Sequence, residues 1–194
     1  MISTYRSESI KNIIISAGMI IDGASGPARK DIIIEGYVMQ YRKDCLIKDF
    51  PLILKTPGKA WHAPGRYGRL IGRTPETGKR LGQSILANSH DIDHVKIINA
   101  GFNSLVSYGK ETLPQFGLKE LKDAVDVADS PGLKVMIHAN GKVPVQIAVE
   151  SGCHSIEHGY FMGDDNLRRI ADERVTLDSQ SFSNGCLCTI VPKG

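Results

Sequence analysis

Two histidines end short β-rich runs at the same point of two consecutive sequence units. His138 closes the run 134–138, His158 closes the run 154–158, and a helical pattern follows each run. If the two runs are neighbouring parallel strands, both imidazoles reach one sheet edge, where a divalent metal ion can bind to them. Such an ion polarises a carbonyl and lowers the pKa of bound water to about 7, which is the chemistry of metal-assisted hydrolysis. The alternative is that each is a hydrogen-bonded strand-end residue, and the matched pair favours the metal site.

A lysine inside a third apolar run is the next candidate. Lys96 lies within residues 93–99, whose β-branched side chains are typical of a buried strand. Burying its ammonium group without a partner is costly, so this lysine needs a carboxylate, a lowered pKa or a chemical modification. The alternative is that its side chain extends to solvent at the edge of the sheet.

A parallel sheet would bring these residues together. Strand and helix patterns alternate from residue 91 to 175, which gives three consecutive βα units and the start of a fourth. One of their helices is expected at 118–129, and another helix is expected before them, at 75–89. The carboxyl ends of such strands are where ligand and metal sites gather. The fold class is therefore α/β. Short β-runs between turn residues at 12–40 predict a small N-terminal antiparallel β element in addition.

Composition excludes several classes of function. The chain has 194 residues, a net charge of +3 and a pI near 8.6. Its basic residues are scattered, which gives no indication of nucleic-acid binding. Apolar runs are too short to span a membrane and the N-terminus is polar, so we expect a cytoplasmic protein with no membrane partner. The four cysteines lack the spacing of a zinc ribbon or a disulfide framework.

Two segments carry a resemblance to a known family. They are His-Ala-Asn-Gly at 138–141 and Ala-Val-Glu-Ser-Gly-Cys-His-Ser-Ile-Glu-His-Gly at 148–159. Together they resemble the metal-dependent amidohydrolase superfamily, and most closely its imidazolonepropionase-like and Xaa-Pro dipeptidase branch. The resemblance implies a TIM-type (β/α) barrel beside the β element. It also implies a divalent metal, expected to be zinc, bound by a carboxylated Lys96 together with His138 and His158. The substrate would be a small amide, cyclic amide or dipeptide.

The chain departs from the family pattern in three places. No His-x-His pair occurs, and the strand-eight Asp that binds metal and serves as general base has no counterpart, because Asp178 follows strand seven too closely. In a long Gly-, Pro- and Arg-rich loop at 55–82, Tyr67 stands where the family often has the His of a Gly-Gly-His string, and His62 is expected to be solvated. The catalytic base is therefore unknown.

We expect a partial barrel for these reasons, since a complete one needs about 250 residues. Residues 1–40 would form a small β-sandwich-like element, 41–177 the partial (β/α) barrel and 178–194 an irregular tail. A strand is expected at 47–54.

Two hypotheses about function follow. The protein is a metal-dependent hydrolase of C–N bonds with an incomplete metal site, or it is a catalytically inactive fragment that needs self-association or a partner chain. Open edges of a partial barrel can pair with another chain, so we expect a homo-oligomer.

Overall fold

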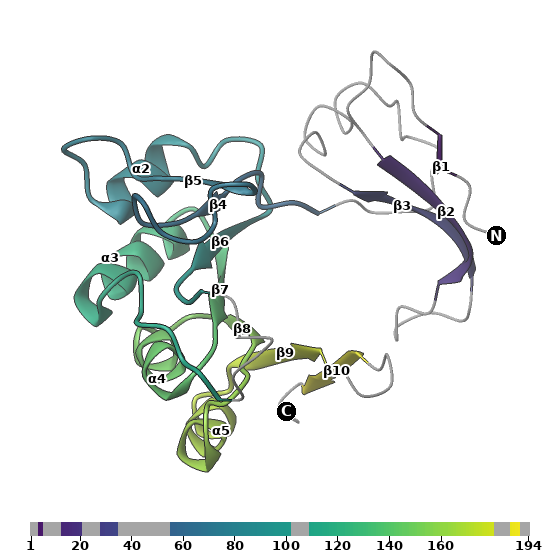
Figure 1. Cartoon of the computed structure of the whole chain (residues 1–194). Helices are drawn as coiled ribbons and strands as arrows, with labels where there is room; N and C mark the ends of the chain where they lie inside the picture. The colour runs from purple at the N-terminus through teal and green to yellow at the C-terminus, as the bar shows by residue number, and fades with distance from the viewer. Residues whose placement is uncertain are drawn as a thin grey trace. The chain divides into compact units, whose positions relative to one another are not determined.

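The computed structural model describes residues 55–101 and 109–180, together with four strands outside these ranges: β1 (Thr4–Tyr5), β2 (Ile13–Ile20), β3 (Ala28–Ile34) and β10 (Leu187–Ile190). The chain divides into two compact units, Met1–Gly58 and Lys59–Gly194 (Figure 1).

The first unit contains a three-stranded antiparallel sheet in the order β1-β2-β3. A shift of register between Ala17 and Ile20 interrupts the β2–β3 pairing. The small antiparallel element predicted from the turn-separated β-runs is therefore confirmed. The compact unit extends to Gly58, beyond the boundary expected at residue 40, and the strand expected at 47–54 lies outside the described residues.

The described residues of the second unit include a seven-stranded sheet in the order β10-β9-β8-β7-β6-β4-β5. Its six parallel strands are β4 (Ala60–Trp61), β5 (Gly72–Arg73), β6 (His94–Ile98), β7 (Lys134–Ala139), β8 (Ser155–His158) and β9 (Thr176–Gln180). Strand β10 pairs with β9 in the antiparallel direction. Four helices connect or follow the parallel strands: α2 (Leu81–Ala87), α3 (Leu118–Asp129), α4 (Lys142–Glu150) and α5 (Asp164–Asp172).

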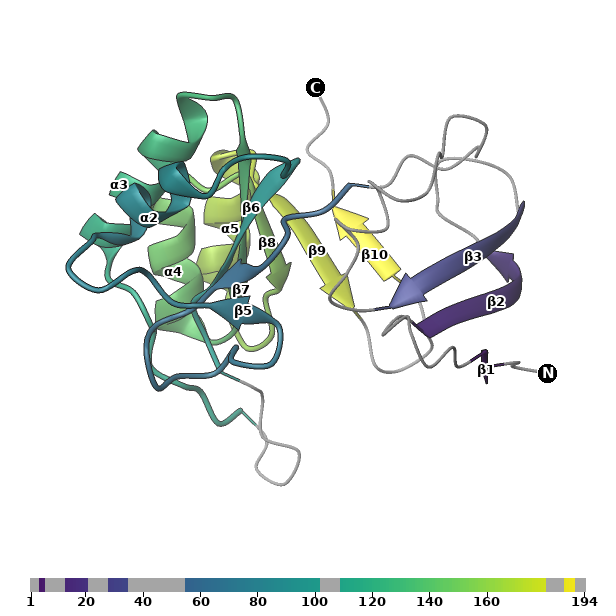
Figure 2. The same cartoon turned by 90° about the horizontal axis from the view of Figure 1, so that it is seen from above.

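The helices cover one face of the sheet. Figures 1 and 2 both show α3, α4 and α5 stacked along the same side of the parallel strands. A parallel sheet with helices on a single face is the arrangement found in a (β/α) barrel, where the opposite face lines the interior. The described sheet has two edge strands, β5 and β10, so it is part of a barrel and not a closed one.

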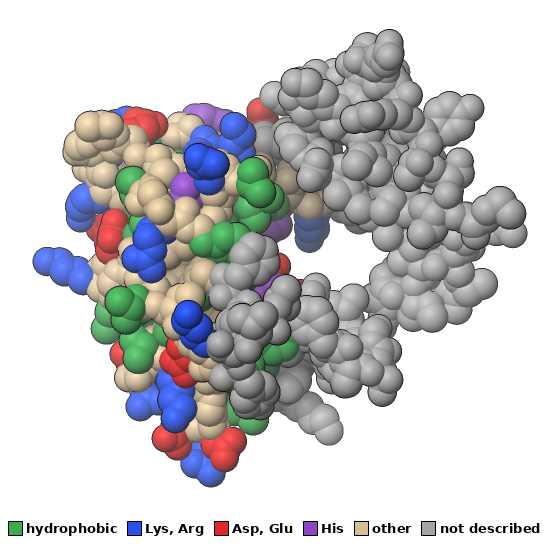
Figure 3. Space-filling model, viewed as in Figure 1, with side chains coloured by type: hydrophobic (Ala, Val, Ile, Leu, Met, Phe, Trp, Pro, Cys, Tyr) green, Lys and Arg blue, Asp and Glu red, His purple; other side chains and the backbone are tan. Residues whose placement is uncertain are grey.

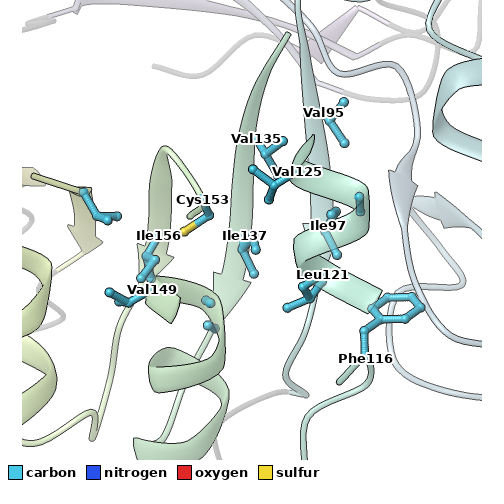
Figure 4. Packing of buried hydrophobic residues seen from close by; sticks show 14 of the residues in the cluster. Val95, Ile97, Phe116, Leu121, Val125, Val135, Ile137, Val149, Cys153 and Ile156 are labelled. Carbon is cyan, nitrogen blue, oxygen red and sulfur yellow. The ribbon is translucent and has the colours of Figure 1, made fainter. Parts of the chain in front are cut away.

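The core lies between the sheet and these helices (Figure 4). Alternate residues of the strands point into it, and they meet the apolar stripes of α3, α4 and α5. The strand residues of this cluster are Val95, Ile97, Val135, Ile137, Ile156 and Leu177, and the helix residues include Leu121, Val125, Val145, Ala148 and Ile170. The βα alternation predicted from residue 91 to 175 is thus confirmed.

Three elements differ from expectation. The segment 55–82 was expected to be a loop, but it carries the two-residue strands β4 and β5, and Trp61 of β4 pairs with Ile97 of β6. Two residues are too few to show a periodic pattern in the sequence. The helix expected at 75–89 begins at Leu81, after a turn at Gly78 with φ +79°. The tail from 178 was expected to be irregular, but β9 continues to Gln180 and β10 pairs with it through the backbone ladder.

The visible surface of the second unit mixes charges of both signs (Figure 3). Lysine and arginine side chains lie among aspartate and glutamate, without a patch of a single sign on this face. None of the described helices is long and apolar enough to cross a bilayer.

Gly159 follows His158 directly, and its substitution tests how tightly this strand end is packed. Gly159 has φ +65°, and an added Cβ would lie 2.8 Å from Leu177 Cδ1, whereas Gly132 has φ +79° and open space around it. Both alanine variants carry left-handed backbone strain of about 1–2 kcal/mol, and Gly159→Ala adds overpacking of about 1–3 kcal/mol. Urea denaturation should show the larger loss for Gly159→Ala. Equal losses would mean that Leu177 moves aside freely.

His154 fastens the amino ends of β7 and β8. Its N–H donates to the Val135 carbonyl at 3.0 Å, and its Nδ1 accepts from the Val135 N–H at 3.1 Å. Burial, and then the charge of Lys134, lowers the pKa of the imidazole, while Asp129 acts in the opposite direction. The fold therefore holds the neutral ring.

This histidine predicts a pH dependence of stability. Below the ordinary histidine pKa of about 6.5, the unfolded chain takes up the proton before the folded protein does, so the contribution of His154 to stability is present above that pH and is lost as the pH falls. We expect the Tm of the wild type to fall more between about pH 7.5 and pH 5.5 than that of His154→Asn, whose oxygen can accept the Val135 N–H without titrating. Thermal unfolding across this range checks it, and parallel curves would contradict it.

Candidate metal centre

The register of the parallel strands places four side chains in one row. Ile98 pairs with His138, His138 with Glu157, and Glu157 with Asp178, on four neighbouring strands. The residue before each of these is an apolar core residue on the helix side, so the row lies on the opposite face, toward the barrel interior. Lys96 points to the same face, two residues before Ile98.

His158 joins this row through an unusual backbone conformation. Strict alternation would direct it to the helix side, but its φ of +73° ends the strand with a left-handed turn. Its ring consequently meets that of His138 edge to face, with 4.8 Å between the ring centroids. The two histidines that the sequence singled out therefore do converge.

One carboxylate oxygen lies at the centre of the site. Oε2 of Glu157 contacts Lys96 Nζ as an ion pair, and it lies 3.6 Å from His138 Nδ1 and 3.4 Å from His158 Nε2. His138, Glu157 and His158 each offer a ligand atom, and these three atoms lie within 4.8 Å of one another. Lys96 and His138 are buried and Glu157 is half-buried.

The electrostatics follow from this packing. Burial lowers the pKa of Lys96, and Glu157 acts against that shift. Burial tends to raise the pKa of Glu157, but the contacts with His138 and Lys96 outweigh it and bring the value to about 2. Burial also lowers the pKa of His158, opposed by Glu157. Glu157 is thus ionised and His158 is favoured as a neutral imidazole, the form in which it binds metals.

These groups fit a divalent cation. Two imidazoles and a carboxylate are ordinary ligands of zinc and related metals. Among the described residues, the buried Nδ1 of His158 has no hydrogen-bond partner, and Lys96 Nζ has no partner beyond its ion pair with Glu157. An unmodified Lys96 is a cation, so it can serve as a ligand only in the carboxylated form that the family resemblance implies.

Neighbouring polar groups orient His138. Its Nε2 lies 3.4 Å from the Gly101 carbonyl and 3.5 Å from Asn140 Nδ2. If Nε2 donates to the Gly101 carbonyl, Nδ1 is the nitrogen left to bind a metal, and an outer contact of this kind fixes a ligating tautomer. Asn140 Oδ1 also accepts from the Tyr160 N–H at 3.0 Å and so joins the loops that follow β7 and β8.

Two tyrosines flank the histidine pair. The Tyr67 ring lies 5.8 Å from that of His138, and the Tyr160 ring stacks on that of His158 at 5.8 Å with 9° between the planes. Tyr67 comes from the loop between β4 and β5, and Tyr160 follows β8. The loop between β4 and β5 therefore brings Tyr67 to the histidine pair.

The structure brings together Lys96, His138 and His158, which the sequence had marked as candidates. Glu157 and Asp178 were not predicted as site residues. Asp178 lies beside Glu157 in the row, and its charge acts on Lys96 and His158. One signal could have found Glu157: it is a second ionisable residue inside a strand, and a buried lysine needs such a partner.

His62 corrects one expectation. It was expected to be solvated in its loop, but it is 4% exposed, with Nδ1 2.9 Å from the Ala63 carbonyl oxygen. The reason is close packing around Gly68 and Gly72, where an added Cβ would lie within 3 Å of the His62 side chain. It belongs to the packing of the loop and is not part of the donor group described above.

Comparison with known proteins supports the fold. No protein-family model and no curated protein matches the chain. Solved structures similar to it include a Xaa-Pro dipeptidase with methionine bound in its active site, at 22% identity and a TM-score of 0.56, covering 74% of this chain and 39% of that one. An ochratoxinase from A. niger matches at 16% identity and a TM-score of 0.57, and the match covers 73% of this chain and 39% of that one. A prolidase complexed with N-methylphosphonate-L-proline matches at 18% identity and a TM-score of 0.53, and the match covers 64% of this chain and 35% of that one.

The fold that the resemblance implied is therefore confirmed. The chain spans 39% or less of the length of these three structures, consistent with a partial (β/α) barrel.

Proposed function

We propose that this protein is a metal-dependent hydrolase of C–N bonds in small amides, cyclic amides or dipeptides. The observation that supports it most directly is the convergence of His138 and His158 on Glu157 at the carboxyl ends of β7 and β8. This is the sheet edge at which barrel enzymes carry their active sites. Two of the similar structures, a Xaa-Pro dipeptidase and a prolidase, agree with this class of substrate.

The cofactor in this proposal is a divalent metal, with zinc as the first candidate. His138 and His158 would hold it, together with either a carboxylated Lys96 or the carboxylate of Glu157. When bound, the metal would polarise the scissile carbonyl and acidify a water molecule. Gly101 and Asn140 would keep the His138 ring in the ligating orientation.

The chain's own carboxylates limit its catalysis. Hydrolysis requires a group that takes a proton from the attacking water and a donor for the leaving nitrogen, each best with a pKa near the working pH. Glu157, with a pKa of about 2, is a weak base. Asp178 is the other carboxylate in the described row. We therefore expect hydrolysis to be slow.

The second candidate function is that of a fragment that works only in an assembly. Strand β5 has two residues and forms one edge of the described sheet. An open parallel sheet offers unpaired backbone groups at its edges, and these can be satisfied by another copy of the chain.

Metal binding tests the site directly. We expect zinc at about one ion per chain, and expect His138→Ala or His158→Ala to abolish binding almost as fully as the double variant, because ligands of one ion act as a unit. The exposed His90 supplies the control His90→Ala, which should retain the metal. Metal analysis after dialysis measures this. Additive partial losses from the two variants would show that the histidines do not share an ion.

The third ligand is decided by two further variants in the same assay. If a carboxylated Lys96 binds the metal, Lys96→Met loses it. If Glu157 binds it, Glu157→Gln loses the metal while Lys96→Met retains or strengthens binding, since the competing ammonium is gone. The zinc-loaded wild type is then assayed on Xaa-Pro dipeptides and small amides. Metal binding without any turnover would leave the assembly-dependent fragment as the better proposal.

Self-association is tested by light scattering at several protein concentrations. We expect a dimer or larger species, because pairing satisfies the open edges of the sheet. The variant Arg73→Pro, within β5, should weaken an association in which β5 pairs with a strand of another copy, since proline cannot donate a hydrogen bond to that strand. A monomer that unfolds cooperatively would contradict the prediction.

A further inference from the structure

Tyr67 occupies a position that the metal ligands do not explain. It lies in the loop that connects β4 to β5, where Pro64, Gly65 and Arg66 before it and Arg69 and Leu70 after it are exposed. Tyr67 itself is half-buried, with its ring beside that of His138. Tyr67 is thus a half-buried residue in an otherwise exposed stretch, and it lies next to a candidate metal ligand. This position indicates that its side chain can contact a substrate bound at the site.

The loop is braced so that this side chain has a fixed place. Gln115 Nε2 donates to the Tyr67 carbonyl at 2.9 Å, and its Oε1 accepts from the Ala63 N–H at 2.9 Å. Arg66 Nη2 donates to the Leu113 carbonyl at 2.8 Å. Gln115 is in turn held by Asn99, at the end of β6, whose backbone oxygen accepts from the Gln115 N–H at 3.0 Å. These contacts tie the loop to the strand that carries Lys96.

Gly68 adds a steric constraint immediately after the tyrosine. Its φ is +123°, and an added Cβ would lie 2.8 Å from both His62 Cβ and Ile98 Cδ1. The backbone therefore packs directly onto the end of β6 and leaves little freedom for the preceding residue. These contacts hold the backbone at Tyr67 in place, and electrostatic stabilisation of a transition state requires donors whose position is set before the reaction.

The two tyrosines at the site differ in their electrostatic surroundings. Burial raises the pKa of Tyr67, and the negative charge of Glu157 raises it further, whereas burial alone acts on Tyr160. The Tyr67 ring lies beside that of His138, with 5.8 Å between the centroids. Tyr160 lies flat against His158 and presents a ring face.

We propose that the Tyr67 hydroxyl donates a hydrogen bond to the scissile carbonyl oxygen of the substrate and stabilises the negative charge that develops there. This inference rests on the proposed function. Water adds to the carbonyl carbon, the C=O π electrons move onto the oxygen, and the C–N bond then breaks as the nitrogen gains a proton. Tyr67 keeps its own proton throughout.

The test uses N-methylphosphonate-L-proline as the probe, because its tetrahedral phosphonate resembles the species formed when water adds to a carbonyl. Calorimetry with the zinc-loaded full chain compares the wild type, Tyr67→Phe and the matched control Tyr160→Phe. Loss of one such donor reduces stabilisation roughly 100-fold. We expect Tyr67→Phe to bind the probe that much more weakly with unchanged zinc content, and Tyr160→Phe to bind nearly as well as the wild type. On an Xaa-Pro dipeptide, kcat/KM should fall by a similar factor for Tyr67→Phe.

Failure of this inference differs from failure of the proposed function. If the wild type binds the phosphonate and Tyr67→Phe binds it equally well, Tyr67 is not the donor, while the hydrolase proposal stands. An equal loss for Tyr67→Phe and Tyr160→Phe also overturns it, since the effect is then one of packing. If the zinc-loaded wild type neither binds the probe nor hydrolyses the dipeptide, both proposals are wrong.

Discussion

The parallel register of β6, β7, β8 and β9 is the constraint on which the site depends. It places His138 beside Glu157 and Glu157 beside Asp178. A slip of one residue would send His138 and Glu157 into the helix-facing core and bring Ile137 and Ile156 to the other face. Packing against the helices prevents this slip, because it buries one strand residue from each of these strands and so determines which side chains face the helices. These residues are Ile97, Ile137, Ile156 and Leu177. The chemistry therefore inherits its geometry from the hydrophobic core.

Glu157 shows how a site can be organised around one atom. Its Oε2 is shared by the ammonium of Lys96 and the imidazoles of His138 and His158. Because Lys96 is buried, its ammonium group is poorly solvated and depends on this carboxylate. A divalent cation that binds between the histidines competes with that ammonium for Glu157, unless Lys96 is first converted to an anion. The same contact thus stabilises the metal-free site and opposes the metal.

The sequence predicted the long elements and missed the short ones for physical reasons. Residues 118–129 were placed correctly as α3, because a helix of this length repeats its apolar stripe several times. Strands β4 and β5 have two residues each, and what defines them is the pairing of β4 with β6 on one side and with β5 on the other. The histidine pair was found because both members end matched units. Glu157 was not, since its partnership with Lys96 arises from a cross-strand arrangement that no spacing along the chain expresses.

Metal binding and catalysis depend on different parts of such a barrel. The donor group lies on β7 and β8, and Lys96 and Asp178 lie on the strands that flank them, so a sheet of four adjacent strands is enough to assemble it. Supporting contacts from Asn99, Gln115 and Asn140 come from loops at the carboxyl ends of these same strands. Proton transfer is a separate requirement, because it needs a base with a suitable pKa, and Glu157 is held too acidic by the contacts that position it. A partial barrel can consequently keep the capacity to bind a metal while its rate of hydrolysis is set by a group outside the donor cluster.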